Sequence, residues 1–258
     1  MRVALSLSYD GRKYHGWQAQ PQVPTVQALL EIALAQIAQH PIDVTCAGRT
    51  DAKVHAMHQV VHFDSHALRR TDAWIHGCNR FLPPEISVNW AAPVADDFHA
   101  RYSATARRYV YIIDNRTTRP SILRHQVTWI YAPLDAQKMH EAAQFLLGEQ
   151  DFTSFRAAEC QSHTAHRCVH AISVKRTQHY IYIDITANAF LHHMVRNIVG
   201  VLMMIGGHKK PLSWIQEVLD ARNRSAAAET AAPQGLYLVD VVYPAHYQIP
   251  RGSFEVYL

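Results

Sequence analysis

The pattern of apolar residues constrains this chain most, because strand-like and helix-like segments alternate along two successive blocks. In the first block, apolar residues alternate with polar ones from Val3 to Tyr9, as in a half-buried strand. The apolar residues of 26–37 then recur at helical spacing, after a predicted N-cap at Thr25. Further strands are predicted near residues 42–47, 59–64 and 86–91, with a helix over residues 71–81.

The second block repeats this alternation. Strands are predicted over residues 108–113, near 169–175 and 180–187, and over 236–243, with helices from Asp135 to Gly148, from Leu191, and over 214–221. The polar face of the helix from Leu191 holds His192, His193, Arg196 and Asn197. The two blocks predict an α+β fold, in which helices cover a largely antiparallel sheet, with two halves at residues 1–100 and 101–258.

Length and composition indicate a soluble intracellular protein. With 258 residues, the chain is long enough for one broad domain or two packed halves. Its longest apolar run, residues 198–205, is well short of the roughly 18 residues that span a bilayer. The N-terminus lacks a signal region, and the four cysteines form no CxxC motif. We therefore expect a cytoplasmic protein with reduced thiols and no membrane segment.

Residues 46–57, with the sequence CAGRTDAKVHAM, place Asp51 in a polar turn between two strand-like runs. Arg49 lies two residues before Asp51, and a neighbouring cation favours the ionised form of a carboxylate. An ionised carboxylate can act as a nucleophile, which makes Asp51 the candidate catalytic residue. A plain surface turn is the alternative, since Asp, Thr and Gly are ordinary turn residues.

A basic segment extends from Phe98 to Arg124. It contains six arginines and one acidic residue, Asp114, although the net charge of the whole chain is only +4. The arginines are Arg101, Arg107, Arg108, Arg116, Arg119 and Arg124, and the interleaved aromatic residues include Tyr102, Tyr109 and Tyr111. Arginine suits phosphates and aromatic rings stack on unpaired bases, so the segment predicts an RNA-binding surface. A solvated basic face is the alternative.

Six segments resemble, in the same order, the TruA family of tRNA pseudouridine synthases. GRTDAKVHA (48–56) is similar to the GRTDAGVHA signature of that family, and the other segments are YDGRKYHGWQAQ (9–20), DDFHARYSATARRYVYII (96–113), GEQDFTSF (148–155), ANAFLHHMVRNIVG (187–200) and QGLYLVDVVYP (234–244). The resemblance implies the pseudouridine synthase fold, in which a catalytic cleft lies between two α/β halves. It also implies a homodimer that converts uridine to pseudouridine at positions 38–40 of the tRNA anticodon stem-loop, with no metal or organic cofactor.

The resemblance assigns roles to five residues of the expected active site. Asp51 takes the place of the family's catalytic aspartate, and it attacks the base, attacks C1′ of the ribose, or aids proton removal from the sugar. Arg49 is expected to flip the target base out of its stack, Tyr109 to stack on the uracil, and Arg196 to pair with Asp51. Leu236 matches an apolar position that packs against the base. From the residues alone, the last four could equally be a turn arginine, a core tyrosine, a solvated helix arginine and a core leucine.

Further segments match parts of the family that contact tRNA. Their residues are Phe98, His99, Ala100, Arg101, Tyr102, Arg107, Arg108, Gln161, Ser162, His163 and Arg167. Side chains of Arg, His, Ser and Gln bind phosphates with little base specificity, so these residues are expected to contact the tRNA backbone.

Two residues near Asp51 depart from the family pattern. Lys53 stands where the family has glycine, and it would strain the loop if this position needs a positive φ, although its charge could reach a phosphate. His58 stands where the family usually has a small residue. Both leave Asp51 in place but change what is expected of the shape of its turn.

Two other functions fit parts of the sequence. Zinc binding is suggested by Cys160, His163, His166, Cys168 and His170, but their spacing follows no standard zinc finger, and we expect no metal. The other alternative is a non-catalytic tRNA-binding protein or folding aid. Such a protein would need the arginines but not Asp51.

Overall fold

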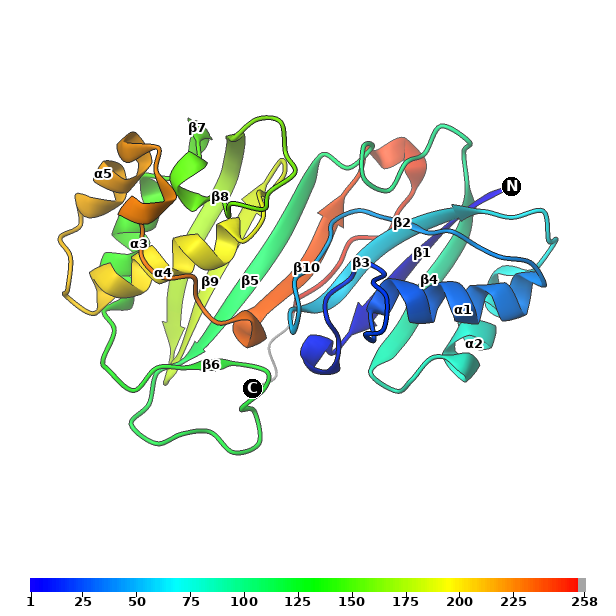
Figure 1. The fold of residues 1–258 in the computed structure, drawn as a ribbon, viewed down its shortest axis with the longest axis horizontal. Helices are drawn as coiled ribbons and strands as arrows, with labels where there is room; N and C mark the ends of the chain where they lie inside the picture. Colours follow the sequence, from blue (N-terminus) through cyan, green and yellow to red (C-terminus); the bar gives the residue numbers. More distant parts are fainter. Residues whose placement is uncertain (255–258) are drawn as a thin grey trace. The chain divides into compact units, whose positions relative to one another are not determined.

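The computed structural model describes residues 1–254, which form two compact units (Figure 1). The first unit comprises Met1–Arg107 and the C-terminal segment from Tyr237 onward, and the second comprises Arg108–Leu236. These bounds differ from the halves expected from the sequence, because the chain returns to the first unit at its end. No helix of the described residues is long and apolar enough to cross a membrane.

Four neighbouring strands form the framework of the first unit. They are, in order, β4 (Ile86–Val94), β1 (Arg2–Tyr9), β3 (His55–Asp64) and β10 (Leu236–Val242). β1 is antiparallel to both of its neighbours, and the short strand β2 (Thr45–Cys46) is antiparallel to β3. β10 runs parallel to β3, with Tyr237 opposite His55. This pairing joins the C-terminal segment to the first unit.

Helices α1 (Val26–Ala38) and α2 (Thr71–Phe81) pack against each other in the first unit, and α2 also contacts β4. Gly77 permits this close approach, since a Cβ there would lie 2.5 Å from Cδ1 of Ile37. The rings of Phe63 and Trp74 meet edge to face at 5.1 Å, and each side chain is 1% exposed. Full burial of a side chain such as Phe63 stabilises the fold by roughly 1.5–3 kcal/mol.

The second unit contains β5 (Ala106–Asp114), which enters the unit at Arg108, followed in spatial order by β9 (Tyr180–Ala187), β8 (His166–Thr177) and β7 (Gly148–Asp151). β8 is antiparallel to β9 and β7, and the short strand β6 (Thr128–Trp129) is parallel to β5. Helix α3 (Ala136–Gln144) packs against β8 and α4 (Met194–Gly206), and α5 (Trp214–Ala221) contacts α4. Short 3-10 helices across the two units cover Gly11–Lys13, Thr153–Phe155, Arg224–Ala226, Pro233–Gly235 and Ala245–Tyr247.

The predicted fold class is confirmed, since both units combine helices with mainly antiparallel strands. The helices predicted over residues 71–81 and 214–221 have the observed bounds of α2 and α5. The helix predicted from Leu191 begins later, at Met194, because His193 has a left-handed backbone with φ of 61°. The helix predicted up to Gly148 ends at Gln144, and Gly148, with φ of +85°, begins β7.

Candidate active site

Asp51 is half-buried in the loop between β2 and β3, and hydrogen bonds hold the backbone of this loop. The hydroxyl groups of Tyr9 and Thr50 are 2.7 Å apart, and the Trp17 amide donates to the Thr50 carbonyl oxygen at 3.0 Å. The Val54 amide donates to the Asp51 carbonyl oxygen at 3.2 Å. The residue before Asp51 and the turn after it are therefore both fixed.

A glycine lies directly against this loop. Gly16 has φ of +91°, and a Cβ at this position would lie 2.8 Å from the Thr50 carbonyl oxygen and 3.1 Å from the Ala52 nitrogen. From β3, Gln59 Nε2 donates to the Gly48 carbonyl oxygen at 2.5 Å. The loop thus packs so closely on its surroundings that a side chain at position 16 would displace it.

Lys53, which stands where the family has glycine, has the positive φ that glycine adopts easily. Its φ is 66°, in the left-handed region, and its amide donates to the Tyr14 carbonyl oxygen at 3.2 Å. The side chain is exposed, and its ammonium group makes no hydrogen bond or ion pair within residues 1–254. Arg49, on the other side of Asp51, is also exposed. The half-buried carboxylate is therefore flanked by two exposed cations on the same loop.

Arg107, which was expected to contact tRNA, is only 8% exposed. Its guanidinium donates to the Ala47 carbonyl oxygen from Nε at 3.3 Å and from Nη2 at 3.0 Å. It also donates to the carbonyl oxygens of Arg101 at 2.5 Å and Ala104 at 3.3 Å. Because Ala47 is the first residue of the loop that carries Asp51, Arg107 joins the basic segment to that loop.

The remaining tRNA-contact residues expected in the first unit divide into buried and exposed side chains. Phe98 and Ala100 are fully buried, whereas Tyr102 is 76% exposed. The His99 ring lies 4.4 Å from the Tyr102 ring, and the Arg101 guanidinium lies over the same ring at 5.6 Å. The tilted ring pair of His99 and Tyr102 and the guanidinium of Arg101 thus offer an aromatic, cationic surface of the kind that binds RNA.

His62 on β3 supports this surface through contacts with Ala100 and His99. Its Nδ1 accepts a hydrogen bond from the Ala100 amide at 3.1 Å, and its ring lies 4.7 Å from that of His99. Burial, together with the nearby His99 and Arg2, lowers the pKa of His62 to about 4. His62 is therefore neutral at physiological pH, which is the form that can accept this hydrogen bond.

Tyr109, Arg196 and Leu236, the other residues of the expected active site, belong to the second unit. Tyr109 is 7% exposed, and its ring packs edge to face on Phe190 at 5.0 Å. Arg196 is half-buried on α4, and its Nε donates to the Ala231 carbonyl oxygen at 2.8 Å. Leu236 is 5% exposed at the start of β10. The contact of Arg196 with Ala231 therefore links α4 to the segment that leads to Leu236.

The segment that leads to Leu236 is itself anchored on β5. The Tyr111 hydroxyl donates to the Ala232 carbonyl oxygen at 2.7 Å, and burial raises the pKa of Tyr111, so this donor stays protonated. A Cβ on Gly235 would lie 2.6 Å from the Ile112 carbonyl oxygen, so only glycine fits at this crossing. Tyr111 and Gly235 together fix the position of the backbone just before Leu236, the first residue of β10.

Asn197 is a further residue of this region, which the sequence pattern placed on the polar face of its helix. It is fully buried, its Nδ2 donates to the Phe155 carbonyl oxygen at 2.8 Å, and its Oδ1 accepts from Thr230 at 2.7 Å and from Arg224 at 3.1 Å. Thr230 adjoins Ala231, the partner of Arg196. The only sequence signal for this role is the position of Asn197 next to Arg196.

The expected tRNA segment at residues 161–167 comprises a loop and the first two residues of β8. Gln161 and His163 are exposed, and Ser162 is half-buried. Arg167 is 8% exposed and donates to Ser162 Oγ at 2.6 Å. Arg108, also expected to contact tRNA, makes a two-point ion pair with Asp184 at 2.9 and 2.6 Å. Arg167 is thus a structural anchor, whereas the side chains of Gln161 and His163 face solvent.

The five potential zinc ligands of the sequence do not gather at one point. Within residues 1–254, no three of them bring their ligand atoms together as a metal site requires. Cys168 Sγ lies 3.7 Å from His170 Nδ1, while Cys160 Sγ accepts a hydrogen bond from the His192 amide at 3.4 Å. Burial raises the pKa of the Cys160 thiol, but the His192 and Ser162 amides and Arg156 outweigh it and lower that pKa below its ordinary value.

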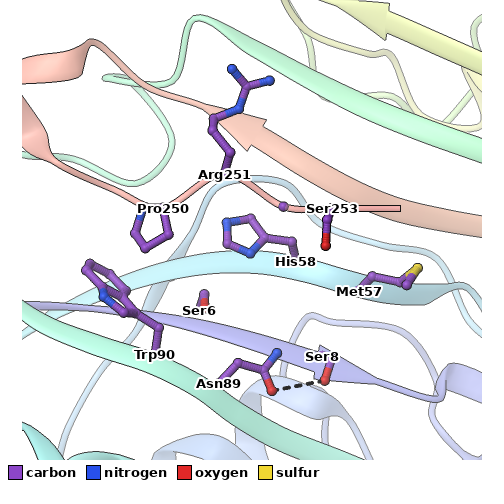
Figure 2. Close-up of a pocket in the computed structure, with 10 residues that line it drawn as sticks. Ser6, Ser8, Met57, His58, Asn89, Trp90, Pro250, Arg251 and Ser253 are labelled. Carbon is purple, nitrogen blue, oxygen red and sulfur yellow. Dashed lines mark hydrogen bonds between the residues drawn. The ribbon is translucent and has the colours of Figure 1, made fainter. Parts of the chain in front are cut away.

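A pocket of about 440 Å³ lies elsewhere in the first unit, between strands β1, β3 and β4 and residues 250–253 (Figure 2). His58, which replaces a small residue of the family pattern, lines it below Arg251, and burial lowers the pKa of His58. Arg251 pairs with the buried Asp240 at 2.6 Å. None of the expected active-site or tRNA-contact residues lines this pocket. His58 therefore lies against the C-terminal segment, on β3 and outside the loop that carries Asp51.

Comparison with known proteins connects these features to one family. The family model for tRNA pseudouridine synthase matches residues 6–103 and 142–244. The tRNA pseudouridine synthase A of Shewanella loihica (strain ATCC BAA-1088 / PV-4) is 59% identical over 251 residues, which cover 97% of this chain and 96% of the relative. The protein of the same name from Shewanella amazonensis (strain ATCC BAA-1098 / SB2B) is 58% identical over 253 residues, covering 98% and 97%.

Similarity to solved structures is weaker. A chain in the crystal structure of a Cbf5-Nop10-Gar1 complex matches 91% of this chain and 57% of its own length, with a TM-score of 0.33 and 11% identity. The family model and the nearly end-to-end relatives decide the assignment: the chain belongs to the tRNA pseudouridine synthase family.

Proposed function

We propose that Asp51 is the nucleophile of this enzyme and that its target is a uridine at positions 38–40 of the tRNA anticodon stem-loop. The reaction class follows from the family: the enzyme isomerises uridine to pseudouridine in tRNA. The observation that carries the assignment of Asp51 is its half-buried position on a loop whose backbone is fixed by Thr50 and packed against Gly16. A catalytic carboxylate needs this kind of fixed support to meet its target in one geometry.

The reaction moves the bond between base and ribose from N1 to C5 of uracil. The N1–C1′ bond breaks, the base rotates, and a C5–C1′ bond forms, while C5 loses a proton and N1 gains one. A carboxylate can assist by attacking the base, by attacking C1′, or by removing a proton from the sugar. Asp51 has the oxygen atoms that each of these routes requires.

Four further residues complete the proposed site. Arg196 pairs with Asp51, and the bond from its Nε to the Ala231 carbonyl oxygen supports this role by fixing the plane of the guanidinium group. Tyr109 stacks on the uracil, supported by the packing of its ring on Phe190. Leu236 packs against the base. Arg49, exposed on the loop of Asp51, occupies the gap left by the flipped base, whose extrusion costs a few kcal/mol.

The proposed tRNA surface consists of the members of the expected segments whose side chains are exposed or half-buried. These are His99, Arg101 and Tyr102 in the first unit and Arg108, Gln161, Ser162 and His163 in the second. Phe98, Ala100, Arg107 and Arg167 are buried, and we propose that they shape this surface from behind. In line with the family resemblance, we also propose a cytoplasmic homodimer that needs no metal or organic cofactor.

Mapping of pseudouridine on unmodified tRNA transcripts tests the proposed target. Purified enzyme is incubated with transcripts that carry a single uridine in the anticodon arm, at position 38, 39 or 40, and pseudouridine is located by carbodiimide labelling and reverse transcription. The proposal predicts modification at these positions and none at uridines of the other arms. Modification confined to another arm would refute the proposed target while leaving the reaction class intact.

A further inference from the structure

His55 is a buried histidine to which the proposed mechanism gives no role. It is the first residue of β3, four residues after Asp51, and it is only 2% exposed. A buried imidazole is costly unless its nitrogen atoms have hydrogen-bond partners. The contacts of His55 therefore show which parts of the first unit it holds together.

The Nδ1 atom of His55 accepts a hydrogen bond from the Gly11 amide at 3.1 Å. An N–H group directed at Nδ1 requires a lone pair there, so the proton of the neutral ring is on Nε2. Asp10 Oδ1 also lies 3.2 Å from Nδ1, but the Asp10 carboxylate is bound by Arg12, from its Nε at 2.9 Å and from its amide at 3.1 Å. His55 is thus a neutral acceptor for the backbone of Gly11.

Gly11 lies directly against the end of the loop that carries Asp51. A Cβ at this position would collide with the Val54 carbonyl oxygen, so only glycine fits here. The Val54 amide in turn donates to the Asp51 carbonyl oxygen at 3.2 Å. The backbone that His55 binds therefore packs on the turn that begins at Asp51.

The segment that contains Gly11, residues 9–17, holds the rest of this loop as well. The Tyr14 carbonyl oxygen accepts from the Lys53 amide at 3.2 Å, and the Trp17 amide donates to the Thr50 carbonyl oxygen at 3.0 Å. These contacts lie on both sides of the aspartate along the chain. The placement of residues 9–17 on β3 therefore determines the path of the loop.

The His55 ring is itself held by the ring of Tyr237. The two rings are 4.7 Å apart and nearly parallel, at 18°, and Tyr237 is opposite His55 where β10 pairs with β3 (Figure 1). Burial and the charge of Asp10 raise the pKa of Tyr237, so its phenol stays neutral. The stacking fixes the plane of the His55 ring, and with it the direction of Nδ1 toward the Gly11 amide.

We propose that His55 is a positioning residue for Asp51. By accepting from Gly11, it fixes residues 9–17 on β3, and these residues fix the turn that carries the carboxylate. The inference rests on the proposed role of Asp51 as nucleophile, and it gives His55 no contact with the substrate. Since a displacement of about 1 Å can cost a hundredfold in rate, this support acts on turnover rather than on tRNA binding.

Two variants of His55 separate its acceptor from its ring, and their turnover of unmodified tRNA tests the proposal. His55→Asn loses the ring but keeps an acceptor at the position of Nδ1, and its kcat is expected to stay within about threefold of wild type. His55→Phe keeps a ring against Tyr237 but loses the acceptor. Its kcat is expected to fall roughly ten- to a hundredfold, with KM changed by less than about twofold.

His140→Phe is the matched control. On α3, in the second unit, His140 Nδ1 accepts a hydrogen bond from the Val174 amide at 3.2 Å. Loss of this acceptor is expected to lower the melting temperature and to leave kcat and KM at their wild-type values. An equal fall of kcat in the two phenylalanine variants would overturn the proposal, because it would reflect lost stability alone.

Three results with His55 would also overturn the proposal: wild-type kcat in His55→Phe, a raised KM with unchanged kcat, or an asparagine variant as slow as the phenylalanine variant. If His55→Phe does not fold, His55→Leu replaces it as a smaller side chain without an acceptor. If neither folds, His55→Asn alone decides, and a fall of its kcat by more than about tenfold counts against the proposal. Wild-type turnover by Asp51→Asn would instead show that the proposed nucleophile is wrong.

Discussion

The Lys53 amide donates a hydrogen bond to the Tyr14 carbonyl oxygen at 3.2 Å, and Lys53 has a left-handed backbone two residues after Asp51. A side chain in this conformation costs roughly 1–2 kcal/mol, whereas glycine adopts it freely. Lys53→Gly is therefore expected to raise the free energy of unfolding by about 1 kcal/mol, after the greater chain entropy of glycine in the unfolded state is counted. Urea unfolding of the two proteins measures this difference.

Ala52→Gly is the matched control for this prediction. Ala52 is exposed in the same loop, and it does not have a positive φ. The same loss of side chain should therefore lower the free energy of unfolding at position 52, by roughly 0.5–1 kcal/mol. Destabilisation by glycine at both positions would show that the backbone of Lys53 is unstrained.

The stability of the fold is expected to fall as the pH drops from about 6.5 toward 4. Burial, with His99 and Arg2 nearby, holds the folded-state pKa of His62 at about 4, below the value of roughly 6.5 in an unfolded chain. The unfolded state therefore binds the proton more readily, so His62 contributes full stability above pH 6.5 and loses it at lower pH. Thermal unfolding at pH 7 and pH 5 measures the change.

His62→Asn provides the comparison, because an amide oxygen can accept the hydrogen bond that the Ala100 amide now gives to Nδ1. The variant should lose less stability than wild type between pH 7 and pH 5. An identical pH dependence in both proteins would assign the effect to other groups, such as His58, whose pKa burial also lowers.

Replacement of the adjacent residues Arg107 and Arg108 by alanine is expected to affect stability and tRNA binding differently. Arg107 is buried and donates to three carbonyl oxygens, so Arg107→Ala should cost about 2–3 kcal/mol of stability. Arg108 pairs with Asp184 near the surface, where such pairs contribute roughly 0–1 kcal/mol. Arg108→Ala should instead reduce the slope of log K against log salt for tRNA binding by about the contribution of one phosphate contact. Equal stability losses in the two variants would contradict this division.

Asn197→Ala is expected to impair both stability and catalysis. Its removal leaves the Phe155 carbonyl oxygen without the Asn197 donor and the Thr230 O–H without the Asn197 acceptor, at a cost of about 2 kcal/mol. Since Thr230 adjoins Ala231, the support of Arg196 shifts as well, and turnover at saturating tRNA should fall. A lower melting temperature with unchanged turnover would show that Asn197 has a structural role only.

The sequence predicted local elements well where a single periodicity dominates. The helices over 71–81 and 214–221 have clear apolar faces and matched the structure at both ends. The pairing of β10 with β3 was beyond the sequence pattern, because hydrogen bonds between strands that are far apart along the chain leave no periodic signal. For this reason the sequence pattern grouped the C-terminal segment with the second half, whereas β10 pairs with β3 of the first unit.

In the candidate site, the burial of polar residues was harder to predict from the sequence. Asn197 was placed on the polar face of a helix, and Arg107 was expected to contact tRNA. Both are buried, and both donate hydrogen bonds to backbone carbonyl oxygens that the fold brings to them. The close approach of Gly16 to Thr50 likewise depends on two segments that meet only in three dimensions. By contrast, the turn at Asp51 was predicted from residues within the turn itself, since glycine, threonine and aspartate are local signals.

The central claim is that Asp51 performs the chemistry, and the turnover of Asp51→Asn on unmodified tRNA tests it most directly. Asp43→Asn, an exposed aspartate of the same unit, serves as the control for the amide replacement. The proposed mechanism predicts that Asp51→Asn forms pseudouridine at least roughly a thousandfold more slowly than wild type, while it retains most of its tRNA affinity and Asp43→Asn stays fully active. Pseudouridine formation by Asp51→Asn at a rate close to that of wild type would contradict the assignment of Asp51 as nucleophile.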